Sequence, residues 1–187
     1  MTVAAEDRIA KLEKKLQYLM DRQEIYDCIT STSRGNDRFD KELIVGAYHP
    51  DAIHELGENK ISGADYGDHA CHAHAAICEV NLHNVTMHRC DIEGDVAHCE
   101  SYVLGLFLDN GCETSRLLAG RYIDKLEKRD GKWGIVLRRA TVEVPLAGSA
   151  KLPNQSFLPG SRYLKGNRDR SDPSYERDLS CDSGGRW

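Results

Sequence analysis

Three polar residues that lie far apart in the chain have the side-chain types needed for an elimination reaction: Asp37, His83 and Arg138. A histidine takes up a proton near neutral pH, and a carboxylate that fixes its tautomer makes it a better base. An arginine keeps its charge and stabilises developing negative charge. Together these groups suffice to remove a proton and release an anion without a metal or a cofactor. Their linear spacing does not show that they meet, so the surrounding sequence has to be considered.

The composition is that of a globular protein. The chain has 187 residues, of which 40% are hydrophobic and 29% are charged, enough for one domain with a sizeable core plus extensions. The net charge of −5 is spread without blocks of like charge, which disfavours nucleic acid or a membrane as partner. No apolar run approaches the roughly 20 residues that span a bilayer. Residues 1–7 lack the features of a signal peptide, so we expect a cytoplasmic protein.

Seven scattered cysteines without a Cys-x-x-Cys pair indicate reduced thiols rather than disulfides. One stretch invites a zinc interpretation, because it contains His69, Cys71, His72, His74 and Cys78. On a helix Cys71, His74 and Cys78 share a face, but no outside residues complete a standard spacing. We therefore expect no metal site and no cofactor. The stretch is interpreted as a helix that covers the mouth of a pocket.

Helical signals dominate the first 48 residues. Apolar residues at three- and four-residue spacing predict an amphipathic helix for packing or subunit contact: Ile9, Leu12, Leu16 and Leu19. A second helix is expected to begin near Asp21, a typical N-cap residue, and to weaken or end within the polar run at residues 31–36. A third helix is expected over residues 39–48, before Pro50.

Strand signals follow. Two short strands (52–56 and 60–61) and an alanine-rich helix (64–80) precede four strand-like segments, at 83–92, 96–108, 116–128 and 133–144. Turn residues at 93–95, 109–111 and 129–131 separate these four segments, which predicts an antiparallel meander. Because the helices come mostly first, the fold class is α+β. Residues 150–187 are rich in glycine, proline and serine, so we expect an irregular extension, partly wrapped on the body and partly disordered.

The order of several short segments resembles the SnoaL-like branch of the nuclear transport factor 2-like superfamily. These are Gly35-Asn36-Asp37-Arg38, Asp51-Ala52-Ile53-His54, the segment from His83 to His88, Gly94-Asp95-Val96-Ala97, the segment from Asp124 to Trp133, and Pro145-Leu146-Ala147-Gly148. Within the branch, the chain is similar to hexachlorocyclohexane dehydrochlorinase and bile-acid 7α-dehydratase. The resemblance implies a cone-shaped α+β barrel, with N-terminal helices packed on a curved antiparallel or mixed sheet around a pocket. It predicts one such domain over residues 1–148 and an extension over residues 149–187.

The resemblance also implies roles for single residues. Asp37 and His83 fall on the catalytic dyad of the branch, and Arg138 falls on its pocket arginine. The neighbouring Arg139 fits that position after a small gap, and adjacent residues of a strand face opposite ways. The position five residues before the aspartate, where the relatives have lysine or tyrosine, is occupied by Thr32.

Three residues are candidates for substrate binding, namely Thr32, His54 and Tyr122; the last two lie where the pocket is lined in the relatives. The resemblance implies a cofactor-independent lyase that removes water, hydrogen halide or formaldehyde from an apolar ring compound. The same base would serve a polyketide-type cyclase or a ketosteroid-type isomerase, and a non-catalytic ligand-binding or assembly module is the third alternative. A homo-oligomer is expected, with a trimer favoured and a dimer possible.

Overall fold

The computed structural model describes residues 3–150, 164 and 166–177. Most of the predicted extension, together with Cys181, therefore lies outside the described residues. The elements in chain order are α1 (Val3–Arg38), α2 (Lys41–Val45), β1 (Tyr48–Leu56), β2 (Asn59–Ser62), α3 (Gly63–Ile77), β3 (Cys78–Glu93), β4 (Val96–Asp109), β5 (Thr114–Arg129), β6 (Lys132–Ser149) and the short 3-10 helix η1 (Pro173–Tyr175). Because β6 continues through Ser149, the division at residue 148 stays a prediction.

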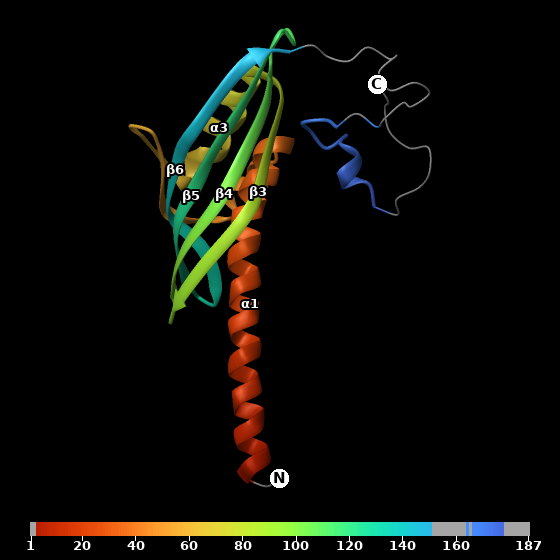
Figure 1. Ribbon diagram of the computed structural model, residues 1–187. Coiled ribbons are helices and arrows are strands. Elements are labelled where there is room, and N and C mark those ends of the chain that lie inside the picture. The colour runs from red at the N-terminus through yellow and green to blue at the C-terminus, as the bar shows by residue number, and fades with distance from the viewer. Residues whose placement is uncertain (1–2, 151–163, 165, 178–187) are drawn as a thin grey trace.

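The strands form an open, mixed six-stranded sheet in the order β2-β1-β6-β5-β4-β3. Only the β1–β6 pair is parallel among the five pairings, and β3 to β6 form the predicted meander. In Figure 1 the long strands curve around α3, with α1 running along the β3 side. The predicted α+β cone is therefore confirmed. The tight turns also fall where the sequence places them, between β3 and β4, β4 and β5, and β5 and β6.

One long helix, α1, replaces the first two predicted helices. The prediction that a helix begins at Asp21 was wrong, because α1 runs unbroken for 36 residues. Asp21 instead makes tertiary contacts: its carboxylate accepts hydrogen bonds from Lys128 Nζ at 2.7 Å and Trp133 Nε1 at 2.9 Å. A polar residue that bonds to the sheet thus looked like a helix cap in the sequence.

The polar run at residues 31–36 does not weaken or end the helix, contrary to the prediction. α1 ends only at Arg38, because the next residue, Phe39, adopts a left-handed conformation with φ 53°. The Asp40 N–H then donates to the Gly35 carbonyl oxygen at 3.0 Å. Thr32, Ser33 and Asn36 are all buried against the rest of the protein. The predicted third helix is also shorter, because Asp40 caps α2 and β1 already begins at Tyr48.

Gly35 is required by close helix packing rather than by a turn. A Cβ added there would lie 2.5 Å from Ile44 Cγ1 on α2, whereas a Cβ added at Gly148 would meet nothing within 4 Å. We expect Gly35→Ala to lower the free energy of unfolding by about 1–3 kcal/mol through overpacking, partly offset by the gain of up to about 1 kcal/mol in helix propensity. Urea unfolding measures the change, with Gly148→Ala as control. Equal stabilities of the two variants would contradict this account.

The core lies between the C-terminal half of α1, α2 and the concave face of the sheet. Its largest fully buried apolar side chains are Ile25, Ile29, Ile44, Leu126, Trp133 and Ile135. The N-terminal half of α1 projects beyond the sheet (Figure 1), so Leu12, Leu16 and Leu19 are all more than half exposed. The leucine stripe therefore does not pack on the described body of its own chain. None of the described helices is both long and apolar enough to cross a membrane.

Candidate functional site

Asp37 and His83 meet where the end of α1 contacts β3. The Asp37 Oδ1 atom lies 2.7 Å from His83 Nδ1, and both carboxylate oxygens accept from the His83 backbone N–H, at 2.9 and 3.1 Å. Each side chain is only 10% exposed. Because an ionised carboxylate only accepts hydrogen bonds, the proton of a neutral His83 ring lies on Nδ1, which leaves the lone pair on Nε2. This is the geometry of an oriented base.

The side chain of Asn81 also bonds to Asp37, and this residue was not predicted from the sequence. It lies two residues before His83 on the same face of β3 and is 1% exposed. Its Nδ2 donates to Asp37 Oδ1 at 3.2 Å and to the Asn36 carbonyl oxygen at 3.0 Å. The amide therefore fixes the end of α1 on the strand. The only signal in the sequence was the two-residue spacing from His83.

A cavity of about 240 Å³ lies inside the curve of the sheet next to His83. Its polar and aromatic lining residues are His54, Tyr66, His74, His83, Phe107, Arg116, Arg121, Tyr122 and Thr141, and the rest of the wall is mostly apolar. The edge of the His83 ring packs against Phe107 and His74, with ring centroids 5.5 and 5.2 Å apart. Tyr66 and His74 come from α3, the helix expected to cover the mouth of the pocket.

Arg138 lies behind the cavity wall and is 1% exposed. Its guanidinium donates to both Asp124 carboxylate oxygens, at 2.7 and 2.8 Å, and to Thr32 Oγ1 at 2.5 Å. It also lies 4.2 Å from the centroid of the Tyr122 ring. Although burial alone would lower the pKa of Arg138, the Asp124 carboxylate raises it above its usual value. The arginine is thus a permanent, paired charge beneath Tyr122.

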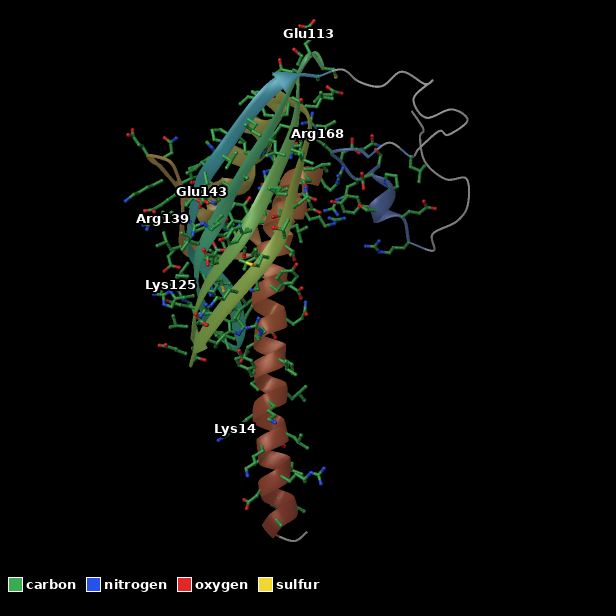
Figure 2. All side chains as sticks on the ribbon, in the orientation of Figure 1. Lys14, Glu113, Lys125, Arg139, Glu143 and Arg168 are labelled. Carbon is green, nitrogen blue, oxygen red and sulfur yellow. The ribbon has the colours of Figure 1, made fainter. Side chains whose placement is uncertain are left out.

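Arg139 faces the other way, toward the outside of the molecule (Figure 2). It pairs there with Glu55 at 2.6 Å. Its side chain is 59% exposed. The inner arginine is therefore Arg138. The predicted site residues divide into two groups: His54, His83 and Tyr122 line the cavity, whereas Thr32, Asp37 and Arg138 lie behind its wall.

The sequence comparison decides the family, since residues 17–139 match the SnoaL-like domain. The chain belongs to the SnoaL-like family. This places it in the SnoaL branch of the nuclear transport factor 2-like superfamily, as predicted from the short segments. No curated protein sequence matches the chain significantly.

Solved structures share the SnoaL-like fold. A type 2 hexachlorocyclohexane dehydrochlorinase, LinA, is 24% identical with a TM-score of 0.68, covering 79% of this chain and 99% of that one. The type 3 enzyme from Novosphingobium barchaimii LL02 is 22% identical with a TM-score of 0.65, covering 75% and 99%. A protein described as a scytalone dehydratase from Novosphingobium aromaticivorans DSM 12444 is 17% identical with a TM-score of 0.61, covering 73% and 91%. At these identities the likeness establishes the fold alone.

His54 is an uncharged, buried histidine in the cavity wall of this SnoaL-like protein. Its Nδ1 lies 2.9 Å from the Tyr48 hydroxyl oxygen, and its ring stacks on Tyr66 with centroids 3.8 Å apart. Its Nε2 is buried without a hydrogen-bond partner among the described residues. Burial, aided by the charge of Arg138, lowers the pKa of His54 to about 3.

The lowered pKa of His54 predicts a loss of stability on acidification. His54 binds a proton near pH 6.5 in the unfolded chain but only near pH 3 in the folded chain. The contribution of neutral His54 to the free energy of unfolding is therefore complete above pH 6.5 and is lost as the pH falls from 6.5 toward 3. We expect the loss to amount to about 1.4 kcal/mol per pH unit below 6.5. His54→Phe should flatten the unfolding free energy between pH 6.5 and 4.5, whereas His98→Asn, at an exposed site, should not. Parallel pH profiles of all three proteins would contradict the assignment.

His74 also stays neutral, because burial lowers its pKa to about 4 and its Nδ1 donates to the Ala70 carbonyl oxygen at 2.8 Å. Within the described part of the chain, the helical set Cys71, His74 and Cys78 does not converge into a group with metal-ligand distances. His74 instead contributes its ring to the cavity beside His83. It is therefore a second candidate base on the same wall.

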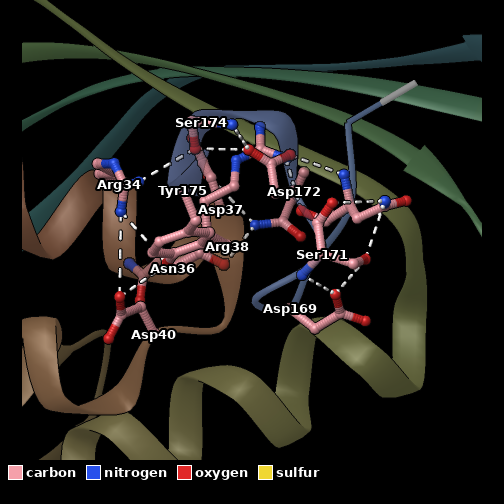
Figure 3. Close-up of polar contacts among 12 residues, drawn as sticks. Arg34, Asn36, Asp37, Arg38, Asp40, Asp169, Ser171, Asp172, Ser174 and Tyr175 are labelled. Atoms are coloured by element: carbon pink, nitrogen blue, oxygen red, sulfur yellow. Dashed lines mark hydrogen bonds and ion pairs between the residues drawn. The ribbon is translucent and has the colours of Figure 1, made fainter. Parts of the chain in front are cut away.

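A segment of the predicted extension packs against the end of α1, as Figure 3 shows. Arg38 pairs with Asp172 at 3.2 Å, and the Tyr175 hydroxyl donates to Asp40 Oδ2 at 2.7 Å. Arg168 donates to the Cys78 carbonyl oxygen at 2.7 Å and so contacts the start of β3. These contacts join the two elements that carry the dyad, so residues 166–177 help to hold the dyad in place.

Proposed function

We propose that this SnoaL-like protein is a cofactor-independent lyase that catalyses base-promoted elimination on a small ring compound. The observation that carries the proposal is the 2.7 Å hydrogen bond between Asp37 and His83, because it leaves the free nitrogen of a cavity-lining histidine as a base. The dehydrochlorinases and the dehydratase named above support a reaction of this class.

In the proposed reaction His83 Nε2 removes a proton from a carbon made acidic by a neighbouring carbonyl, ring or halide. The electron pair of the broken C–H bond forms the C=C bond, and the leaving group departs with its own bonding pair as halide or, after protonation, water. Asp37 holds the imidazole in its tautomer and stabilises the imidazolium that forms. His54, through its unpartnered Nε2, and Tyr122 would bind polar atoms of the substrate.

Arg138 is proposed to stabilise the departing anion through the field of its charge beneath Tyr122. Thr32 and Asp124 hold the guanidinium in place, so no reorganisation is needed as negative charge develops. Thr32 would therefore act on the substrate through Arg138 and Tyr122, since it is fully buried behind them.

The volume and lining of the cavity limit the size and polarity of the substrate. Its volume of about 240 Å³ is below the roughly 300–1,000 Å³ of pockets for drug-sized ligands. Its wall is mostly apolar with a few convergent polar groups. Both features favour a compact, mostly apolar ring compound, such as a halogenated or hydroxylated alicycle.

We also propose a homo-oligomer in the cytoplasm, with a trimer favoured and a dimer possible. Leu82, Leu106 and Leu146 lie along one cross-strand row on the convex face of the sheet and are 36–58% exposed. An exposed apolar row of this kind is typical of an interface with another protein surface. Sedimentation analysis would test the subunit count.

Product analysis tests the proposed reaction. The protein is incubated in D₂O with chlorinated cyclohexanes and cyclic β-hydroxy ketones, and products are identified by mass spectrometry. Elimination predicts an alkene together with released halide or water, in amounts that depend on His83. Deuterium uptake at carbon without loss of a group would indicate an isomerase, and a product with a new ring would indicate a cyclase. Ligand binding without turnover by folded protein would favour a non-catalytic module.

A further inference from the structure

A second cluster of reactive side chains lies on β3 and β4, away from the cavity. Within the described residues, His88, Cys90 and Cys99 form the one group whose potential metal-ligand atoms all lie within 4.8 Å of one another. Cys90 and Cys99 are direct cross-strand partners, and His88 is two residues from Cys90 on the same face of β3. The sheet register therefore brings these three groups together.

The two cysteines of the cluster are buried, and its histidine is incompletely paired. Cys90 and Cys99 are each 4% exposed and both are free thiols. The His88 ring bonds through Nδ1 to Ser101 Oγ at 2.9 Å, while its Nε2 is buried and has no hydrogen-bond partner in the part of the chain that the structure describes. A buried imidazole nitrogen without a partner is costly. Together with the two thiols, this nitrogen offers a set of ligand atoms for a cation.

We propose that His88, Cys90 and Cys99 bind a thiophilic d¹⁰ cation of the zinc(II) class. This proposal departs from the absence of a metal that we expected from the sequence. Thiolate and imidazole are the ligands that zinc prefers, and a tetrahedral ion with ligand bonds near 2.3 Å places sulfur atoms about 3.8 Å apart. The cluster thus needs to contract by no more than about 1 Å to reach this geometry.

The charges also suit a buried site. Two thiolates and a neutral imidazole around a divalent cation give no net charge, so burial of the complex avoids the penalty for an isolated ion. Three protein ligands leave a fourth coordination position for water or a small anion.

The site has its own supporting contacts. Ser101 holds His88 Nδ1, which directs Nε2 toward the ion, as the outer partners of metal-binding histidines do. Tyr26 of α1 packs on the His88 ring with centroids 5.3 Å apart, and Arg22 Nη1 donates to the Cys90 carbonyl oxygen at 3.0 Å. A bound ion would therefore fasten β3 to β4 directly beneath α1.

The cluster also adjoins the polar residues behind the cavity. Cys99 is the cross-strand partner of Asp124, Asp124 is that of Arg138, and Arg138 is that of His54. The three thiol and imidazole ligands nevertheless lie outside the cavity lining. The proposed ion is therefore structural with respect to the Asp37–His83 dyad, and its loss is expected to alter stability more than the chemical step.

Metal titration of the reduced, untagged full-length protein tests the proposal. Zinc(II) should bind with a stoichiometry of one ion per chain, and cobalt(II) in its place should show thiolate-to-metal charge-transfer absorption. Cys90→Ser and Cys99→Ser should each lower zinc affinity at least about ten-fold and remove or shift the absorption, and Ser101→Ala should weaken binding about ten-fold through His88. Cys71→Ser, at a buried thiol outside the cluster, should bind as the wild type does.

X-ray absorption spectroscopy of the wild-type zinc complex measures the ligands of the ion directly, so this test does not require the variants to fold. It should show two sulfur ligands near 2.3 Å and at least one nitrogen near 2.0 Å. The proposal is overturned if the reduced wild type binds no zinc stoichiometrically, or if the bound zinc has no sulfur ligands. Unchanged affinity in folded Cys90→Ser and Cys99→Ser variants would overturn it as well. A Cys90–Cys99 disulfide in protein that binds no metal after reduction would assign the thiols to redox chemistry instead.

Discussion

His83→Ala should lower kcat/KM for the elimination by about 10²–10⁴-fold, because a positioned general base contributes a factor of that size. Binding of a substrate analogue should change little, since the His83 ring is one of many groups in a mostly apolar cavity wall. The measurement is steady-state turnover of whichever ring compound the product analysis identifies, together with the Kd of a non-reacting analogue. Substitution of the exposed His98 by Ala is the matched control.

Asp37→Asn should cause a comparable loss of kcat while leaving the overall fold in place. An amide that donates to Nδ1 would move the imidazole proton to Nε2, the nitrogen that has to act as base. Asp91→Asn is the control, because its side chain is exposed on the same strand as His83. A loss of activity in both aspartate variants would point to an effect of charge rather than of the dyad.

Full activity of His83→Ala would place the base elsewhere. His74 is then the alternative, because its ring lies 5.2 Å from that of His83 on the same cavity wall. The pH profile separates the two, since burial lowers the pKa of His74 to about 4 and a base of this kind stays active down to mildly acidic pH. His74→Ala should then abolish turnover.

The sheet was predictable because local patterns encode it, whereas the contact between Asp37 and His83 was expected from the resemblance to the family. Strand alternation and turn residues placed the meander correctly, and the short segment around Asp37 pointed to the family. The unbroken α1 was not predictable, because polar residues such as Asp21 and Thr32 bond to partners more than 100 residues away, Trp133 and Arg138. The need for a glycine at position 35 was not visible in the sequence either, because the atom that excludes a side chain there belongs to Ile44 on another helix.

The register of the sheet decides which side chains surround the site, and a single sequence does not reveal this register. The pairing of Cys90 with Cys99 and of Asp124 with Arg138 requires strand partners to be known residue by residue. A register one residue different would have placed these side chains on opposite faces. Arg138 was expected to be the pocket arginine, whereas in the structure its guanidinium bonds to Asp124 and Thr32 behind Tyr122.

Arg138→Met should lower the free energy of unfolding by about 3–5 kcal/mol, because it leaves the Asp124 carboxylate buried without its partner. Asp124 is 2% exposed, so water does not replace the lost hydrogen bonds without opening the sheet. Urea unfolding of the purified variant measures the loss. Arg139→Met is the control, because its ion pair with Glu55 lies at the surface and is expected to contribute no more than about 1 kcal/mol.

The double variant Asp124→Leu/Arg138→Met separates stability from function. Removing both charges takes away the uncompensated carboxylate, so most of the lost stability should return, as it does when buried ion pairs are replaced by apolar side chains of similar size. If Arg138 acts on the reaction, kcat of the stably folded double variant should stay low, because no positive charge lies beneath Tyr122 when the leaving group departs. Recovery of both stability and turnover would instead assign the ion pair a purely structural role and leave the reaction to His83 and Asp37.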